Sequence, residues 1–411
     1  MKVKQLLLFF CAGFTLIAAA DGDFIADKVD PAAAGMNAER LARIPIRMKE
    51  FVDAGKTAGV VTLVMRHGHI ASLDAVGYQD LEHKTPMKVD SIFRIMSVTK
   101  PITCAGVMAL VDDGRLSLLD PVENFVAEFK GLRVNPCGSR VGHNCELVMP
   151  LRPVNVLDLM THTSGLGDGG GRGGAAGPPS SRTEMVASTV SRATLLFQPG
   201  TAWNYSNFGI AVLGQIIEVV SGKPYDRFMA ERFFEPLGMK DTFFDVPSEK
   251  ASRVATIYTY ADGSLKTLTR PTPSGPRIPS PDSGLLSTAG DLARFNQMML
   301  NKGVLNGKRV LSAAATESMT TSYTGDIQAG YAPGVGQGYG YEVVREALGM
   351  YRYTSIGTFE KAGVYRTYVW VDRAKDLVGT ILMQRNTGGP AADLADEVNI
   401  FMAMAAAAID H

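Results

Sequence analysis

The sequence predicts an α+β fold, in which both ends of the chain build an antiparallel sheet flanked by helices and a mainly helical domain is inserted between them. Two observations lead to this prediction. Each end combines a helical segment with a hairpin of β-branched strands, and the middle of the chain is dominated by helical periodicity. We therefore expect an α/β domain from residues 21–110 and 285–411, and a helical domain from residues 111–284. A cleft between such domains is a natural place for a binding site.

The N-terminal part of the sheet domain is indicated by three segments. Apolar residues recur at helical spacing between residues 37 and 55, which predicts an amphipathic helix. Residues 59–66 and 70–76 are rich in β-branched side chains and flank a tight turn at Gly68, the pattern of an antiparallel hairpin.

The C-terminal part repeats this pattern. Residues 365–372 and 377–383 flank a polar turn, and a last helix is expected from about Ala391. Between the two ends, residues 208–220 and 225–234 are helical in pattern and are separated by loops rich in glycine and proline.

Composition narrows the class of protein and of partner. The 411 residues are 46% apolar and carry a formal net charge of zero, without the basic surface that nucleic acid requires. The first 20 residues resemble an export signal, with two lysines, an apolar run and small residues before Asp21. We expect cleavage after Ala20 and a periplasmic or secreted protein. An uncleaved anchor is the alternative, but the apolar run is shorter than the roughly 20 residues of a spanning helix.

Three cysteines follow that segment. Cys137 and Cys145 bound a short polar loop, so in an oxidising compartment they either form a disulfide or remain as two thiols. Cys104 lies in an apolar stretch, which favours a packing role over a nucleophilic one.

The strongest local signal for chemistry is Ser97-Val-Thr-Lys100, directly before an apolar run. If a helix begins near Ser97, the Lys100 amine lies on the same face as the Ser97 hydroxyl. Unpaired N–H groups at the first helical turn would also favour an oxyanion at an acylated serine. Taken alone, a four-residue pattern of this kind arises by chance in many proteins.

A second signal is Tyr205-Ser-Asn207, in a turn before a helix. A tyrosine beside a lysine ammonium can exist as a phenolate, take the proton from Ser97 and return it to a leaving group. Asn207 would hold Lys100 and a substrate carbonyl. The alternative is that Tyr205 is a packing residue and Asn207 a helix N-cap.

Together these motifs resemble the superfamily of class C β-lactamases, which also contains D-alanyl-D-alanine peptidases and family VIII carboxylesterases. Further segments resemble the same relatives, namely 159–166, 236–242 and 283–292, so that the resemblance runs from about residue 55 to 385. It implies a β-lactamase/transpeptidase-like fold and catalytic roles for Ser97, Lys100 and Tyr205.

The resemblance also implies a third motif on the strand at the edge of the cleft. Tyr368-Val-Trp-Val-Asp372 sets the register and places Lys361-Ala362-Gly363 at the triplet, which is Lys-Thr-Gly or Trp-Gly-Gly in relatives. The N–H groups of Val364 and Ser97 would then form the oxyanion hole. Lys361 would offer a cation to a substrate carboxylate, Ala362 lacks the usual hydroxyl, and Glu360 is close enough in sequence to neutralise Lys361.

These features predict a serine hydrolase that forms an acyl-enzyme on Ser97, with small carboxylic esters as the first choice of substrate. The alternatives are a β-lactamase or D-amino-acid peptidase, and a catalytically silent protein that binds cell-wall fragments. The chemistry requires no cofactor and no metal. His67 and His69 share one face of a predicted strand, but their position beside an exposed turn favours a solvated hairpin end over a metal site. We expect a small-molecule partner, no nucleic acid and no stable membrane insertion, and the sequence leaves the oligomeric state open.

Overall fold

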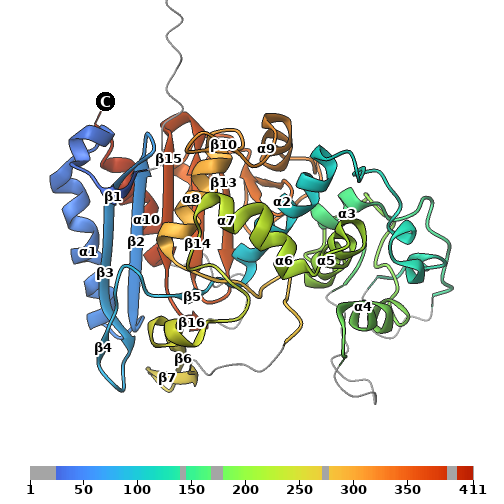
Figure 1. Ribbon diagram of the computed structural model, residues 1–411, viewed down its shortest axis with the longest axis horizontal. Helices are drawn as coiled ribbons and strands as arrows, with labels where there is room; N and C mark the ends of the chain where they lie inside the picture. Colours follow the sequence, from blue (N-terminus) through green and yellow to red (C-terminus); the bar gives the residue numbers. More distant parts are fainter. Residues whose placement is uncertain (1–24, 139–144, 168–178, 271–276, 387–395, 411) are drawn as a thin grey trace, which may run out of the picture.

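A nine-stranded sheet occupies one half of the computed structural model, and its strands come from both ends of the chain (Figure 1). The structure describes residues 25–138, 145–167, 179–270, 277–386 and 396–410. The sheet order is β1-β3-β2-β15-β14-β13-β12-β11, and β4 pairs with β3 at one edge. The bounds are β1 Ile25–Lys28, β2 Gly59–Arg66, β3 His69–Asp80, β4 Thr85–Pro86, β11 Val335–Gln337, β12 Glu342–Val344, β13 Phe359–Gly363, β14 Thr367–Asp372 and β15 Leu377–Leu382.

The two predicted hairpins meet at the centre of this sheet. β2 pairs antiparallel with β15, so that Val61 lies opposite Leu382 and Arg66 opposite Leu377. Every residue of β14 and β15 is buried, as expected for strands covered on both faces. The N-terminal and C-terminal segments therefore form one layer.

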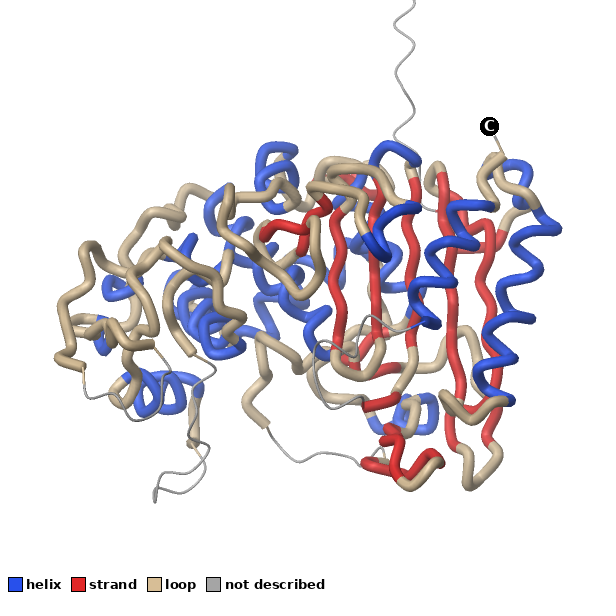
Figure 2. The backbone as a smooth tube through the Cα atoms, turned by 180° about the vertical axis from the view of Figure 1, so that it is seen from behind, coloured by secondary structure: helices blue, strands red, loops and turns tan. Residues whose placement is uncertain are grey.

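Helices cover both faces of the sheet. Helices α1 (Ala38–Asp53) and α10 (Asp396–Ala407) lie on the face seen in Figure 2, and α8 (Ala289–Leu300) lies on the face seen in Figure 1. Side chains of β14 alternate between the two cores: Trp370 packs with α1 and α10, whereas Val369 packs on the α8 side. This alternation produces a three-layer arrangement.

The remaining helices gather beside the sheet. The longest are α2 (Thr99–Asp112), which follows Ser97, and α5 (Asn207–Ser221), which follows Tyr205. These two helices pack against each other, and residues 99–110 of α2 are all buried. Shorter helices complete this half: α3 Val156–Met160, α4 Arg182–Val190, α6 Tyr225–Met229 with a π-helical continuation Ala230–Phe234, α7 Glu235–Leu237 and α9 Ala313–Met319.

Small sheets add detail that the periodicity did not predict. Strands β6 (Ile257–Ala261) and β7 (Ser264–Thr269) lie within the range predicted to be mainly helical. They pair with each other, and β6 also pairs with β16 (Arg385–Asn386). Two further ladders pair β5 (Phe93–Arg94) with β8 (Leu286–Ser287), and β9 (Val304–Leu305) with β10 (Lys308–Arg309). The domain boundaries at residues 110 and 285 stay a prediction.

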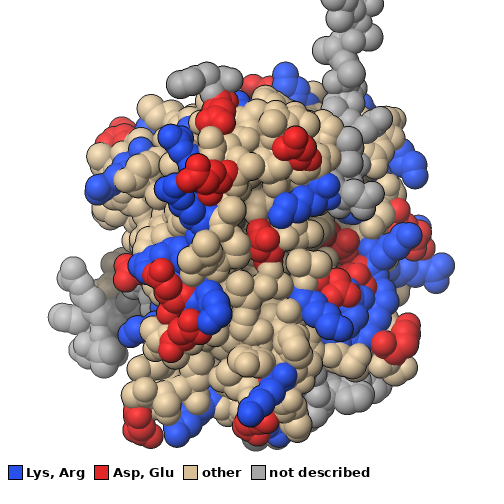
Figure 3. All heavy atoms as spheres, turned by 90° about the vertical axis from the view of Figure 1, so that its left-hand side faces the viewer, with Lys and Arg blue, Asp and Glu red and all other residues tan. Residues whose placement is uncertain are grey.

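Several other expectations concern the surface and the termini. Cys137 and Cys145 form a disulfide. The face in Figure 3 carries basic and acidic side chains intermixed, without a patch of one sign. In the described ranges no helix is long and apolar enough to cross a membrane. The predicted export signal at residues 1–20 and the start of the predicted last helix, near Ala391, lie outside the described residues.

Candidate active site

Ser97 lies in a 3₁₀ turn, Met96–Val98, immediately before α2. The preceding residue, Met96, has a φ of 49°, in the left-handed region that side chains other than glycine seldom adopt. Such a conformation costs about 1–3 kcal/mol and is common beside functional groups. The chain therefore accepts strain at the residue that sets the position of the Ser97 hydroxyl.

Lys100 is fully buried, and its ammonium is held by three hydrogen bonds. Nζ donates to Ser97 Oγ at 3.0 Å, to Asn207 Oδ1 at 2.7 Å and to the carbonyl oxygen of Asp282 at 2.9 Å. All three acceptors are neutral, and no carboxylate of the described residues forms an ion pair with Lys100. Because Ser97 Oγ accepts from Lys100, the serine hydrogen is directed to a different acceptor.

Tyr205 lies beside this cluster at the start of α5. Ser206 is the N-cap of that helix, so Asn207 is its first residue and its side chain is available to Lys100. The Lys100 and Lys361 ammonium nitrogens lie 4.8 and 5.0 Å from the Tyr205 ring centre. Within the described chain no hydrogen bond joins the Tyr205 hydroxyl to Ser97. The structure thus brings Tyr205 to the site between two cations, without the direct contact.

His162, which lies in the segment 159–166, is a neighbour of Tyr205. The centres of the two rings are 4.6 Å apart, and His162 Nδ1 accepts a hydrogen bond from the Ser206 N–H at 3.2 Å. Burial, together with the nearby Lys361 and Lys100 ammoniums, lowers the pKa of His162 well below its usual value. His162 is therefore a neutral ring that packs against Tyr205.

The end of β13 lies directly against the segment that carries Ser97. A Cβ on Gly363 would lie 2.5 Å from the Ile95 carbonyl oxygen, so only glycine fits. The Thr367 hydroxyl donates to the same oxygen at 2.9 Å. Among the described residues no protein acceptor takes the N–H of Ser97 or of Val364. These two donors remain available for a substrate oxygen.

Lys361 is buried, and its ammonium is paired with an acidic side chain of the protein. Its ammonium lies 3.3 Å from Glu342 Oε1, and both side chains are nearly inaccessible to solvent. Burial disfavours the charged form, but Tyr205, Glu342 and Glu360 outweigh burial and raise the pKa of Lys361. The suggestion that Glu360 neutralises Lys361 needs correction: the ion-pair partner is Glu342.

The Glu360 carboxylate makes a different contact because neighbouring residues of a strand project to opposite faces. It accepts a hydrogen bond from the Tyr351 hydroxyl at 2.8 Å, and burial raises its pKa.

The other sequence candidates lie outside this cluster. Cys104 is buried, and burial raises its pKa to about 12, which leaves little nucleophilic thiolate. His67 Nδ1 lies 2.6 Å from Asp376 Oδ2, beside an exposed turn. In the part of the chain that the structure describes, no three His, Cys, Asp or Glu side chains gather as a metal site would require.

Comparison with known proteins identifies the family. A model of the Beta-lactamase family matches residues 47–401. The chain belongs to the beta-lactamase family of serine hydrolases. This beta-lactamase-family chain is 31% identical over 396 residues to "Esterase EstB" from Burkholderia gladioli, a match that covers 88% of this chain and 94% of EstB. It is 26% identical over 361 residues to the "D-alanyl-D-alanine-carboxypeptidase/endopeptidase AmpH" of Escherichia coli (strain K12), with 86% of each chain covered.

Solved structures agree on the fold of this beta-lactamase-family chain. "EstCE1, a hydrolase with promiscuous acyltransferase activity" has a TM-score of 0.73 at 22% identity and covers 91% of this chain and 99% of its own. The octameric penicillin-binding protein homologue from Pyrococcus abyssi has a TM-score of 0.67 at 27% identity and covers 89% and 76%. The predicted resemblance and the predicted α+β, β-lactamase-like fold are confirmed.

Proposed function

We propose that this serine hydrolase is a carboxylesterase that cleaves small esters through an acyl-enzyme on Ser97. The observation that carries the choice of ester is the buried ion pair between Lys361 and Glu342. A lysine that is already paired inside the protein offers little to the carboxylate of a β-lactam or of a peptide C-terminus. The similarity to EstB supports the same choice.

The contacts of Lys100 support a division of roles between it and Tyr205. Lys100 holds Ser97 Oγ in place, so the Ser97 proton passes to the Tyr205 oxygen as Oγ attacks the ester carbonyl carbon. The carbonyl oxygen becomes negative and is stabilised by the N–H groups of Ser97 and Val364. The C–O bond then breaks, and the alkoxide leaves with the proton held by Tyr205.

The second half of the reaction repeats these steps with water. Tyr205 takes a proton from water, the hydroxide attacks the acyl carbon, and Ser97 regains a proton as the carboxylic acid departs. Asn207 holds the Lys100 ammonium in position during both halves of the reaction, since its Oδ1 accepts a hydrogen bond from Nζ.

The test compares two substrates on the wild type and two variants. We expect a short-chain p-nitrophenyl ester to be hydrolysed and a chromogenic cephalosporin to be hydrolysed weakly. Ser97→Ala should abolish ester turnover, and Tyr205→Phe should lower kcat by roughly 10²- to 10⁴-fold, since it removes proton transfer while it keeps the ring. Circular dichroism of each variant checks that the fold is intact.

Other outcomes would redirect the assignment. Dominant turnover of cephalosporin would identify a β-lactamase, and cleavage of a D-alanyl-D-alanine peptide alone would identify a peptidase, the activity named for AmpH. Binding of cell-wall fragments without covalent acylation would indicate a silent binding protein. Ester turnover unchanged in Ser97→Ala would overturn the proposed nucleophile.

We also propose that the protein acts in the periplasm or outside the cell. The pattern of residues 1–20 and the Cys137–Cys145 disulfide support this, because disulfides persist in oxidising compartments. N-terminal sequencing of the protein recovered from its natural host, with Asp21 as the expected first residue, tests the proposal.

A further inference from the structure

A cavity of about 530 Å³ lies beside the segments that carry the nucleophile. Arg94, three residues before Ser97, lines it from β5, and Ser280 and Gly284 also line it. Asp282, which lies between those two wall residues, supplies the carbonyl that holds Lys100. The cavity and the nucleophile therefore share both of the chain segments that position the reacting groups.

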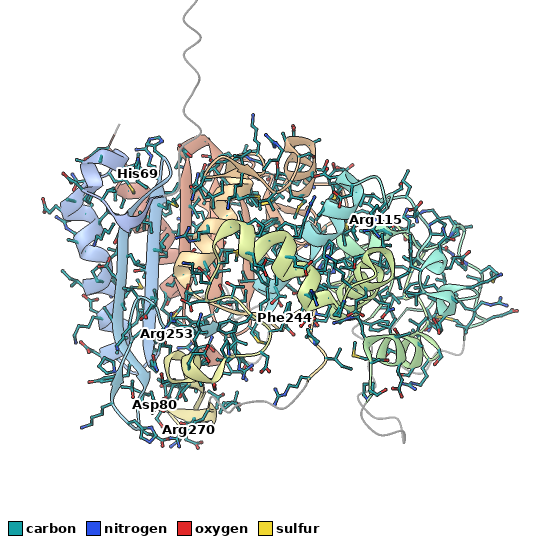
Figure 4. The ribbon with its side chains drawn as sticks, viewed as in Figure 1. His69, Asp80, Arg115, Phe244, Arg253 and Arg270 are labelled. Atoms are coloured by element: carbon teal, nitrogen blue, oxygen red, sulfur yellow. A yellow bond between two sulfur atoms is a disulfide. The ribbon has the colours of Figure 1, made fainter. Side chains whose placement is uncertain are left out.

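The walls of this cavity are largely apolar. The apolar lining residues include Phe234, Phe243, Phe244, Val246 and Ile278. Figure 4 labels Phe244, which lies close to α6 near the middle of the molecule. A lining of this kind suits a hydrocarbon chain, because burial of each methylene group is favourable.

Two guanidinium groups share the cavity with these apolar side chains. Arg94 is half-buried and Arg277 is exposed, and in the described part of the chain neither forms an ion pair with a carboxylate. Asp226 and Asp245 also line the cavity, but neither is among the charges that act on Arg94. Burial, followed by repulsion from Arg277, lowers the pKa of Arg94.

The two guanidinium groups repel each other, and an anion that binds to both of them relieves this repulsion. A guanidinium fits a carboxylate through paired N–H donors, and the interaction is strong where water is partly excluded. Lys361 does not supply this recognition, because it is paired with Glu342.

We propose that the cavity binds the acyl part of the substrate and that Arg94 and Arg277 bind a carboxylate at the end of that acyl part. Half-esters of dicarboxylic acids are then the preferred substrates. This inference rests on the proposed esterase function and names its substrate class. The carboxylate would remain bound through both halves of the reaction, since the acyl group stays attached to Ser97 until water releases it.

The test uses mono-p-nitrophenyl adipate and p-nitrophenyl hexanoate, whose acyl chains have the same length and differ in the terminal carboxylate. We expect kcat/KM for the adipate ester to exceed that for the hexanoate ester by roughly ten- to a hundredfold in the wild type. In Arg277→Gln and in Arg94→Gln this ratio should fall by about tenfold or more. Arg277 is exposed, so its variant tests the proposal even if Arg94→Gln is unstable.

Arg192→Gln is the matched control, because Arg192 is exposed and lies outside the cavity lining. Its substrate ratio should equal that of the wild type. Ser97-dependent hydrolysis of the hexanoate ester with no preference for adipate would overturn the inference and leave the proposed esterase function intact. No turnover of either ester would overturn the esterase proposal itself.

A third substrate, 4-(hexanoyloxy)benzoate, places the carboxylate on the leaving group. A preference for it over adipate that is lost in Arg277→Gln would overturn the acyl placement, because the two arginines would then bind the alcohol side.

Discussion

The Lys361 ammonium and the Glu342 carboxylate form a buried ion pair at 3.3 Å, at the edge of the candidate active site. Both side chains are nearly inaccessible, so each charge depends on the other for compensation. In relatives with Lys-Thr-Gly at this position, the resemblance implies that the lysine serves the substrate. In this chain Glu342 takes the place of a substrate carboxylate beside Lys361.

This pair leads to a prediction for Glu342→Gln. The variant leaves Lys361 without its acid, so we expect the free energy of unfolding to fall by about 3–5 kcal/mol. The ratio of cephalosporin to ester kcat/KM should rise by roughly tenfold, because the freed ammonium can bind a carboxylate. Denaturant unfolding and steady-state kinetics measure the two effects.

Glu397→Gln is the control for that experiment. Glu397 forms a buried ion pair with Arg366 and belongs to α10, so its loss is also destabilising. Its substrate ratio should remain that of the wild type. An equal shift of the ratio in both variants would show that general loosening, and not the release of Lys361, causes the change.

His162 is expected to act as a positioning residue for Tyr205. Its φ of 59° is tolerated by asparagine, so His162→Asn removes the ring while it keeps the backbone conformation. We expect kcat on the ester to fall by roughly ten- to a hundredfold with little change in KM, because the Tyr205 ring loses its support.

The matched variant is His67→Asn, since His67 also has a positive φ, of 52°, but lies at an exposed turn. It should retain wild-type kinetics. If His162→Asn also retained wild-type kcat, packing of this ring against Tyr205 would have no part in catalysis.

Gly363→Ala is predicted to damage the oxyanion hole. The added methyl group would lie 2.5 Å from the Ile95 carbonyl oxygen and would push β13 away from the Ser97 segment. Loss of one oxyanion donor lowers kcat by roughly 10²- to 10³-fold, and we expect a drop of that order in ester hydrolysis. In Gly290→Ala, where a Cβ has no neighbour within 4 Å, activity should be retained. Comparable losses in the two variants would contradict the proposed geometry.

Asp291 gives a prediction for the pH dependence of stability. Burial raises its pKa to about 6, although the Asp241 N–H and the Thr242 hydroxyl both donate to its Oδ2. The folded state thus holds the proton more tightly than the unfolded state, where the pKa is 3.8. The stability from this site is complete below about pH 4 and is lost as the pH rises through about 6.

The loss should amount to about 3 kcal/mol and should be absent in Asp291→Asn, which accepts the same hydrogen bonds but does not titrate. Urea unfolding of both proteins between pH 4 and pH 7 measures it. Parallel stability curves for the wild type and the variant would show that Asp291 does not titrate differently in the folded state.

The parts of the fold with strong local patterns are predictable from the sequence. The predicted helix at residues 37–55 and the two hairpins correspond to α1, β2–β3 and β14–β15, because apolar periodicity and β-branched runs act over neighbouring residues. Short strands such as β11 and β12 have no such pattern. β11 and β12 pair with each other, and β12 joins the sheet only by pairing with β13, so their place depends on the tertiary fold.

The candidate site also combines residues that the sequence predicts with residues that only the tertiary fold brings together. Ser97 and Lys100 are three residues apart, so helical geometry alone predicts that they meet. Asp282, Glu342 and the ring of His162 reach the site only through the tertiary fold. Every residue type has a backbone carbonyl, so the sequence does not indicate that the carbonyl of Asp282 binds Lys100.

The pairing of β2 with β15 has a consequence for how the chain is made. During synthesis β2 leaves the ribosome long before β15, the strand that covers its edge, because the two strands are far apart along the chain. Until then β2 presents an open apolar edge that can pair with other chains. Contacts between segments so distant along the chain also slow folding. Chaperone capture of the nascent chain should therefore be strongest before residue 377 emerges.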